Sequence, residues 1–352
     1  MGKVMLSTDN IKSLLDGKPV AKVPRYHFML GFCAKNVGYP IRVMYMEPEK
    51  SFLAQAWTFE QYGIEGWPEY GYASYGGWEF GGDIKFPESE WEQAPSHGSF
   101  AVKSEADIAK LRMPDVKKDG ALPLAMEFSK LQDKYGTPIS VILGGNFTIA
   151  GNICSVETLC RWILKKPELA HRLLTMATDH MVEVVQLWAD TFGAERVIPN
   201  IWEPLASNQI ISPKQFEVFA FPYLKEFSEK CLAMGIKHLY YHMCGVQKAN
   251  LKYWERIPMG NPGMVSFGHQ VDLPTAIKYF GDRCIILGNI DPIVLQMGTK
   301  QQVYEICKEA IEIGKTAPRG FLLMEGCEFP PMTPPHNSYV MTKAVNDFGW
   351  YK

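Results

Sequence analysis

The chain has 352 residues, of which 47% are hydrophobic and 21% charged, and its formal net charge at pH 7 is −2. This composition fits one large α/β domain or two ordinary ones, and the absence of a basic block argues against nucleic-acid binding. No apolar run reaches the roughly 18 residues that cross a bilayer, and residues 1–22 lack a signal-peptide core. The eight cysteines show no disulfide-framework spacing, so we expect a cytoplasmic protein.

The first 63 residues predict helices on either side of a strand. A short helix is expected over 5–17, started by Ser7 or Thr8, and a strand over 24–31. Apolar residues recur at helical spacing over 50–63, which predicts a second helix. These elements would form an N-terminal extension ahead of the more regular part of the chain.

An aromatic-rich insertion follows around residues 57–91, where eleven of 35 residues are aromatic and glycines are interleaved. The stretch 76–86 predicts hairpin strands. One interpretation is a subdomain that packs on the rim of the main fold. The other is a flat hydrophobic wall for an aromatic ligand.

From Pro138 onward, strand-like and helix-like stretches alternate. The predicted strands are 139–143, 196–201, 236–244, 264–267, 284–287 and 320–324. The predicted helices are 155–165, 167–192, 213–234, 246–255, 273–280, 300–315 and 335–347. Such alternation is typical of a parallel sheet, and two more units fit before Pro138. The sequence therefore predicts a single (β/α)8 TIM barrel, with residues 1–352 as one domain.

The predicted strands end in polar residues, and a barrel of this kind carries its chemistry at the carboxyl ends of its strands. No glycine-rich dinucleotide or P-loop pattern is present. The polar residues at these ends are Asn146, Glu203, His242, Cys244, His269, Asn289, Asp291, Glu325 and Cys327. They would converge on one rim.

His242 and Cys244 are the most informative of these residues. Side chains two positions apart on a strand point to the same face, and Cys327 ends another predicted strand. One imidazole and two thiolates form a three-ligand zinc set with an open fourth position, as in catalytic zinc sites. The alternative is two buried core cysteines and a hydrogen-bonded histidine.

Four segments carry a resemblance to a known family. They are 143–150, 211–223, 287–299 and 326–337, in this order along the chain. Together they resemble the uroporphyrinogen decarboxylase superfamily, whose fold is a single (β/α)8 barrel. Its true decarboxylases carry an N-terminal Arg-Gln-Ala-Gly-Arg motif that binds porphyrinogen carboxylates. The corresponding place here begins Arg25-Tyr26-His27 and lacks the glutamine and the paired arginines, which disfavours decarboxylation.

The other branch of this superfamily comprises zinc-dependent methyltransferases that work with a corrinoid protein. Their His-x-Cys and distant Gly-Cys pattern matches His242, Cys244 and Cys327, which the resemblance implies as Zn²⁺ ligands. It also implies Glu203 as an acidic residue near the metal, although a hydrogen-bond acceptor behind the metal ligands or an acidic residue at a helix start is equally compatible. No Asp-x-His-x-x-Gly corrinoid signature occurs, so cobalamin would arrive on a corrinoid-binding partner protein or as a free cofactor.

Three interpretations of the reaction are open. The aromatic insertion, together with Tyr26, Phe28 and Trp202, favours transfer from a small methylated substrate such as a phenyl methyl ether to the cobalt of a corrinoid protein. The alternative is a methylcorrinoid:thiol methyltransferase that uses a coenzyme M-like acceptor. A barrel with decarboxylase-like chemistry or a non-catalytic binding role is the third reading.

The remaining candidates have two interpretations each. His269 would protonate a leaving group or hold substrate, or it is a packed core histidine. Asn146 and Asn289 would bind substrate, or they are scaffolding of the rim, as is Asp291.

Overall fold

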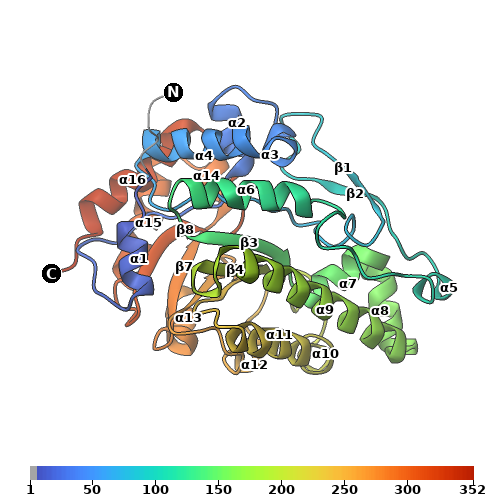
Figure 1. Cartoon of the computed structure of the whole chain (residues 1–352). Coiled ribbons are helices and arrows are strands. Elements are labelled where there is room, and N and C mark those ends of the chain that lie inside the picture. The colour runs from blue at the N-terminus through green and yellow to red at the C-terminus, as the bar shows by residue number, and fades with distance from the viewer. Residues whose placement is uncertain (1–5) are drawn as a thin grey trace.

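The computed structural model describes residues 6–352 and is built around one parallel sheet (Figure 1). Its six strands follow chain order, and each pairs in parallel with the next. The strands are β3 (Ile139–Gly144), β4 (Val197–Trp202), β5 (Tyr240–Met243), β6 (Gly263–Phe267), β7 (Cys284–Ile290) and β8 (Phe321–Glu325). Each overlaps a strand predicted from the sequence, so the predicted α/β class with a parallel sheet is confirmed.

Helices alternate with these strands and lie outside the sheet (Figure 1). Those that precede the sheet are α1 (Asp9–Leu15), α2 (Leu30–Asn36), α3 (Val43–Met46), α4 (Pro48–Tyr62), α5 (Glu105–Ile108) and α6 (Leu122–Lys134). Those that follow β3 are α7 (Asn146–Cys154), α8 (Val156–Lys165) and α9 (Pro167–Phe192), before the 3-10 turn η1 (Ala194–Arg196). The later helices are α10 (Pro213–Phe219), α11 (Phe221–Ala233), α12 (Leu251–Trp254), α13 (Leu273–Phe280), α14 (Pro292–Met297), α15 (Lys300–Gly314) and α16 (Pro335–Phe348).

Most predicted helices are present, and the exceptions have local causes. The helix expected over 213–234 is two helices, because Pro222 lacks the N–H that would continue the first one. The helix expected over 246–255 is reduced to α12. The helix expected over 5–17 is α1, and Met5, its expected first residue, lies outside the described residues. Helices α2, α3, α5, α6, α7 and α14 were not predicted.

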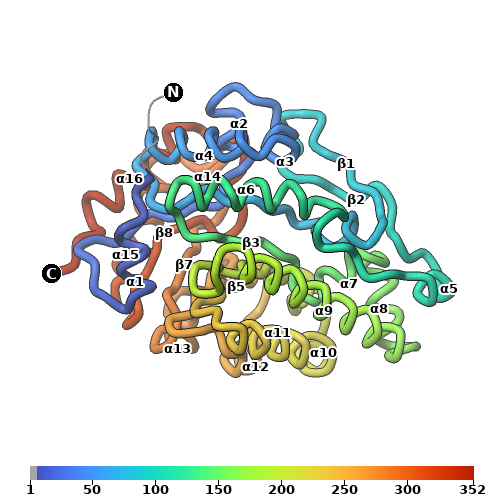
Figure 2. Tube along the Cα trace, in the orientation of Figure 1, coloured from blue at the N-terminus to red at the C-terminus, as the bar shows by residue number. Residues whose placement is uncertain are grey.

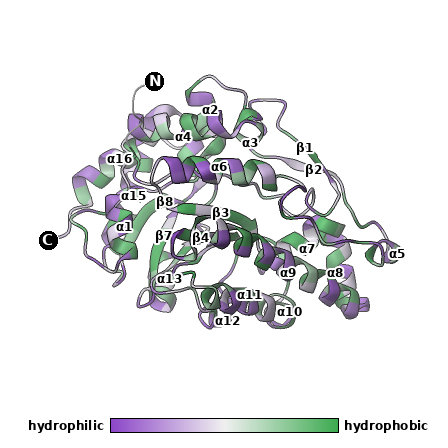
Figure 3. Ribbon diagram, viewed as in Figure 1, coloured by the Kyte–Doolittle hydropathy of each residue, from purple (hydrophilic) through white to green (hydrophobic). Residues whose placement is uncertain are grey.

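Alternation along the strands separates two packing layers. One set of side chains faces the helices, and the other forms an interior cluster on the opposite side of the strands. Figure 3 shows the apolar strands beneath helices whose outer faces are hydrophilic. The interior cluster includes Ile198, Tyr240, Met264, Leu287 and Met324, with Leu14 of α1 packed against it near the start of β8. Tyr240 therefore points inward, and so does His242 two residues later.

The eight-stranded closed barrel predicted from the sequence is present only in part. Within residues 6–352, six strands form the sheet. Arg25 makes a single parallel bridge to Leu323 of β8, supported by backbone hydrogen bonds from Tyr26 to Leu323 and from Leu323 to Pro24. On the far edge, Gly71 lies against Ile142 of β3 without a ladder of strand hydrogen bonds. These two segments occupy the edges where the first two strands were expected.

The strand expected over 24–31 is wrong beyond this bridge. The chain leaves the extended conformation and enters α2 at Leu30, whose apolar face packs in the helix-facing core. A run of aromatic and aliphatic residues fits either a buried strand or a buried helix, so the sequence pattern could not separate them.

The aromatic insertion packs into the protein. Trp67, Tyr70, Tyr72 and Tyr75 are all buried. The predicted hairpin over 76–86 is wrong for residues 76–82, because residues 76–81 form turns and Gly82 lies outside any strand. The observed hairpin joins β1 (Asp83–Lys85) to β2 (Ser96–Ser99). This arrangement matches the packing interpretation of the segment rather than a wall for a ligand.

The C-terminal end of the chain lies beside the dark blue segment that follows α1, as the tube in Figure 2 shows. Val23 donates a backbone hydrogen bond to Gly349, and Tyr351 donates one to Ala21. All eight cysteines are free thiols. Among residues 6–352, no helix is both long and apolar enough to span a membrane.

Candidate metal and active site

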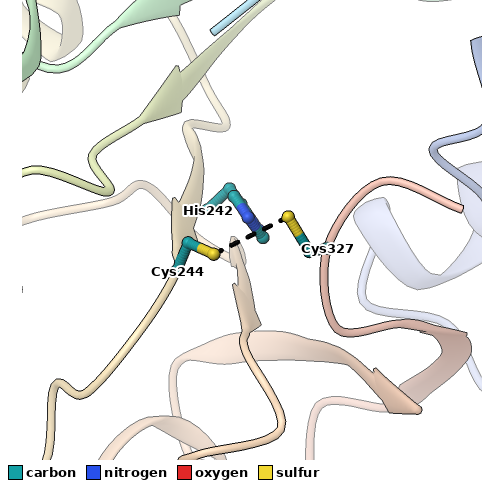
Figure 4. A group of neighbouring side chains, drawn as sticks. All are labelled: His242, Cys244 and Cys327. Atoms are coloured by element: carbon teal, nitrogen blue, oxygen red, sulfur yellow. Dashed lines mark hydrogen bonds between the residues drawn. The ribbon is translucent and has the colours of Figure 1, made fainter. Parts of the chain in front are cut away.

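His242, Cys244 and Cys327 meet at the carboxyl ends of β5 and β8. Their donor atoms all lie within 4.8 Å of one another. Figure 4 shows the two cysteine side chains pointing toward each other, with the His242 ring beside the line that joins the sulfurs. The structure therefore brings together the three residues that the sequence pattern selected.

The spacing of these donors suits a tetrahedral zinc ion. The Sγ atoms of Cys244 and Cys327 are 3.7 Å apart. Two sulfurs bound at the usual Zn–S length with a tetrahedral angle are about 3.8 Å apart. Three protein donors also leave one position for a substrate atom, as catalytic zinc sites require. The residues present thus fit the metal that the sequence implies.

The two thiols share a hydrogen bond that shifts their pKa values in opposite directions. This bond lowers the pKa of Cys244, and it raises the pKa of Cys327 to about 12, with burial adding to the increase. Without a metal, Cys327 therefore holds its proton more tightly than Cys244 does, and Cys244 is the more acidic of the two thiols. Metal binding would displace that proton because the thiolate is the ligand form.

A hydrogen-bonded pair lies behind His242. Its Nδ1 is 2.8 Å from the Ser266 hydroxyl oxygen, and Ser266 accepts a 3.0 Å hydrogen bond from the Tyr240 hydroxyl. Ser266 is the residue that faces His242 in the register of β5 and β6. Since Nδ1 is engaged, Nε2 is the ring nitrogen left for a metal. The contacts of Ser266 and Tyr240 behind His242 were not predicted, because the sequence does not give the register of the strands.

Two aromatic side chains flank the metal-binding residues. The Trp202 ring is 6.5 Å from the His242 ring, and the Phe28 ring packs edge-to-face on Trp202 at 4.3 Å. Trp202 is fixed by the hydrogen bond from its indole N–H to Asn200, 2.9 Å long. Tyr26, also expected to bind substrate, is fully buried against Trp67 and Tyr240 in the interior cluster. Phe28 and Trp202 are thus the predicted aromatic residues that lie near the metal-binding set.

Glu203 is fully buried and faces the start of α7. Its carboxylate accepts hydrogen bonds from the backbone N–H groups of Phe147 and Thr148 and from the Thr148 hydroxyl. Burial raises its pKa to about 7 against the lowering effect of these bonds. Its backbone N–H also donates to the His242 carbonyl, so Glu203 joins α7 to β5. The carboxylate is not part of the three-donor group found among the described residues.

His269 lies on the loop after β6, and Asn289 lies near the carboxyl end of β7. His269 Nδ1 is 3.6 Å from the Asp291 carboxylate, and its side chain is 40% exposed. Asn289 donates both amide hydrogens to the loop after β6, at 3.3 Å to Gly268 and 2.6 Å to Val271. His269 is therefore accessible rather than a core histidine, and Asn289 fixes the loop that carries it.

Asn146 begins α7 and is fully buried. Its amide donates to Thr178 of α9 at 2.6 Å, and its Oδ1 has no partner among the described protein atoms. The contact between α7 and α9 explains the hydrogen bond that the side-chain amide of Asn146 donates. The predicted substrate role rests on the free acceptor alone.

The family of this chain follows from comparison with known proteins. A family model described as "Uroporphyrinogen decarboxylase (URO-D)" matches residues 6–348. The chain belongs to the uroporphyrinogen decarboxylase family. This match spans nearly all of the described chain and agrees with the resemblance seen in the sequence.

Similar members of the uroporphyrinogen decarboxylase family carry two kinds of name. The "Methylcobamide:CoM methyltransferase MtbA" of Methanosarcina acetivorans is 27% identical over 76% of this chain and 76% of its own length. The "Methylated-thiol--coenzyme M methyltransferase" of Methanosarcina mazei is 30% identical over 56% of this chain and 52% of its own length. The uroporphyrinogen decarboxylase of Myxococcus xanthus is 24% identical over 70% of each chain.

A solved structure supports the fold. A methyltransferase from Methanosarcina mazei matches with a TM-score of 0.82 at 22% identity, over 98% of this chain and 99% of that one. Identity at this level shows a shared fold, so the six strands and their helices are arranged as in that methyltransferase.

Proposed function

We propose that this protein is a zinc-dependent methyltransferase that moves a methyl group between the cobalt of a corrinoid and a heteroatom of a small substrate. The observation that carries the proposal is the open His242, Cys244 and Cys327 donor set at the strand ends. The names of several relatives, which describe methyltransferases for methylcobamides, support the corrinoid part. We further propose that a separate corrinoid-binding protein delivers the cofactor.

We infer that the heteroatom is the sulfur of a thiol. The relatives' names describe coenzyme M and methylated thiols, which favours the thiol acceptor over the methyl-ether donor preferred from sequence alone. The packing of Tyr70, Tyr72 and Tyr75 weakens the sequence argument for an aromatic donor, because these rings are buried and therefore do not line a ligand site. The proposed acceptor is therefore a small thiol.

The residues of the chain have separate roles in this reaction. His242, Cys244 and Cys327 would hold zinc, which lowers the pKa of a thiol substrate and so supplies a thiolate at neutral pH. Trp202 lies beside His242 with Phe28 packed against it, and this apolar pair would limit the access of water to that side of the site. The thiolate sulfur then attacks the methyl carbon on cobalt. The S–C bond forms as the Co–C bond breaks, and its electron pair stays on cobalt, which passes from Co(III) to Co(I).

A phenyl methyl ether is the second candidate substrate, and one observation favours it. Phe28 and Trp202 form an edge-to-face pair directly beside His242, a surface on which an aromatic ring could stack. In that direction cob(I)alamin takes the methyl group from the ether oxygen, and the electron pair of the broken C–O bond stays on the phenoxide. Zinc would neutralise this leaving group.

Decarboxylation of a porphyrinogen is disfavoured by the position of Arg25. Its guanidinium is fully buried and donates to the Ser338 carbonyl, the Ser338 hydroxyl and the Thr342 hydroxyl, all on α16. These bonds leave it unable to bind a substrate carboxylate. Arg25 is thus a structural link between the edge of the sheet and the last helix.

The proposal is tested with purified protein, methylcob(III)alamin and a series of small thiols, followed by visible spectroscopy of the cobalamin. We expect one zinc per chain and thiol-dependent loss of methylcobalamin. Cys244→Ala and Cys327→Ala should each abolish both the zinc content and the thiol-dependent loss of methylcobalamin. Cys160→Ala is the matched control, because Cys160 is also half-buried but lies on α8, outside the donor set.

Two results would contradict the proposal. Purified protein that holds less than a third of a zinc per chain and gains none on incubation would exclude a zinc enzyme. Zinc-containing protein that demethylates a phenyl methyl ether with cob(I)alamin, and leaves methylcobalamin intact with every thiol, would replace the thiol acceptor with the ether donor.

A further inference from the structure

The hydrogen-bonded pair behind His242 has a geometry that the proposed reaction does not by itself explain. Ser266 lies on β6, directly opposite His242 on β5, and is completely buried. Its hydroxyl oxygen is 2.8 Å from His242 Nδ1 and 3.0 Å from the Tyr240 hydroxyl. Both contacts are within the range of good hydrogen bonds. Ser266 thus joins two side chains of the neighbouring strand.

We infer that Ser266 and Tyr240 are positioning residues that fix the ring orientation and tautomer of His242 for metal binding through Nε2. A hydroxyl oxygen has two lone pairs, so Ser266 can accept from both Nδ1–H and the Tyr240 hydroxyl. With the proton on Nδ1, the Nε2 lone pair is free for a metal. This inference rests on the metal site of the proposed function.

The surroundings of Tyr240 support this assignment. Its hydroxyl has one other neighbour, the weak acceptor Met324 Sδ at 3.5 Å, and its ring packs against Tyr26 in the interior cluster. A buried hydroxyl is costly without a good acceptor, and Ser266 supplies one. The Tyr240 hydroxyl therefore holds the Ser266 oxygen in place, and Ser266 holds the imidazole.

The aromatic neighbour of His242 cannot supply this support. The Trp202 ring lies 6.5 Å from the imidazole and limits its movement without directing a ring nitrogen. Partners of metal-bound histidines commonly set the tautomer, and their loss lowers metal affinity 10- to 100-fold. We expect a loss of this size on removal of the Ser266 hydroxyl.

The same strand offers a matched control. Tyr241 faces the opposite side of β5, and its hydroxyl lies 2.6 Å from the Ser228 hydroxyl, in a buried tyrosine–serine pair that does not touch His242. Ser228→Ala and Tyr241→Phe therefore remove equivalent hydrogen bonds away from the donor set. They report the purely structural cost of such a change.

The experiment measures the zinc dissociation constant by competition with a chromophoric chelator, together with the visible spectrum of the Co²⁺-substituted protein. Ser266→Ala should weaken zinc binding 10- to 100-fold and change the Co²⁺ bands. Ser266→Thr, which keeps the hydroxyl, should restore affinity to within threefold of wild type. Ser228→Ala should have less than a twofold effect.

Equal zinc affinities and Co²⁺ spectra for Ser266→Ala and Ser228→Ala would overturn this inference and leave the proposed methyl transfer standing. A wild-type protein that binds no zinc would overturn both. If Ser266→Ala does not fold, Tyr240→Phe replaces it, since the ring is kept. Tyr240→Phe should then bind zinc at least threefold more weakly than Tyr241→Phe, and equal binding would again overturn the inference.

Discussion

Glu203 accepts a 2.9 Å hydrogen bond from the backbone N–H of Phe147, at the first turn of α7. A second backbone N–H and the hydroxyl of Thr148 converge on the same carboxylate. Anions are favourable at a helix N-terminus, where unpaired N–H groups point outward. This contact connects the end of β4 to the start of α7, and it gives Glu203 a role that the sequence pattern left open.

Replacement of this carboxylate should damage stability more than metal binding. In Glu203→Ala the two N–H groups and one hydroxyl lose their buried acceptor, and each unsatisfied group costs about 1–3 kcal/mol. We expect unfolding in urea to show a loss of about 3 kcal/mol or more, with zinc still bound at one per chain. Loss of zinc with unchanged folding would instead make Glu203 a metal-site residue.

Glu69 predicts a pH dependence of stability. It is buried, hydrogen-bonded to Ser140 at 2.7 Å, and burial raises its pKa to about 7 from 4.5. The folded protein therefore holds this proton more tightly than the unfolded chain does. The resulting stability is fully present below pH 4.5 and is lost as the pH rises through about 7.

Glu69→Gln should remove this dependence, because an amide does not titrate. Relative to the variant, the wild-type protein should lose about 2 kcal/mol of unfolding free energy between pH 5 and pH 8. Urea titrations at the two pH values measure this difference. Glu60→Gln, at an exposed position of α4, is the control and should show no such change. A constant difference between wild type and Glu69→Gln would contradict the assignment.

Metal removal should expose a difference between the two cysteines. The shared hydrogen bond lowers the pKa of Cys244 and raises that of Cys327 to about 12, and the thiolate is the reactive form. With zinc bound, we expect little reaction of either residue with iodoacetamide. After chelation Cys244 should be alkylated first, at least tenfold faster than Cys327. Mass spectrometry of the labelled peptides measures both rates, and equal rates would argue against the unequal pair.

Phe28 offers a test of substrate class. Its ring packs on Trp202 beside His242, so Phe28→Leu removes the edge-to-face contact but keeps an apolar side chain. If an aromatic methyl donor is the substrate, kcat/KM for it should fall about tenfold, a transition-state loss of roughly 1.4 kcal/mol. Thiol methylation and zinc content should change less than twofold. A uniform loss across both substrate classes would indicate a structural defect.

The sequence predicted the main features of the sheet and of the donor set because both depend on simple periodicity. All six strands of the sheet were expected, and His242 and Cys244 share a face because strand side chains alternate with a period of two. Cys327 joins them because parallel strands present their carboxyl ends at one edge. None of these inferences needs the strand register.

Features that depend on register or on unpredicted helices could not be obtained in this way. Ser266 faces His242 only through the pairing of β5 with β6. The contact of Glu203 with α7 required a helix that begins directly after β3, where the sequence suggested a strand end followed by a loop. Arg25 lies in the segment that was predicted as the first strand, but hydroxyl groups far away in the sequence, on α16, accept hydrogen bonds from its guanidinium.

The three donors come from distant parts of the chain, and this arrangement has a kinetic consequence. Cys244 and Cys327 are 83 residues apart, with β6 and β7 between them. A bound ion would therefore link the end of β8 to the end of β5, and local opening of either strand end would remove a donor and speed the release of the ion. The rate at which bound zinc exchanges with a zinc isotope in solution would then report how often these strand ends open locally. Ordinary unfolding titrations average out this motion.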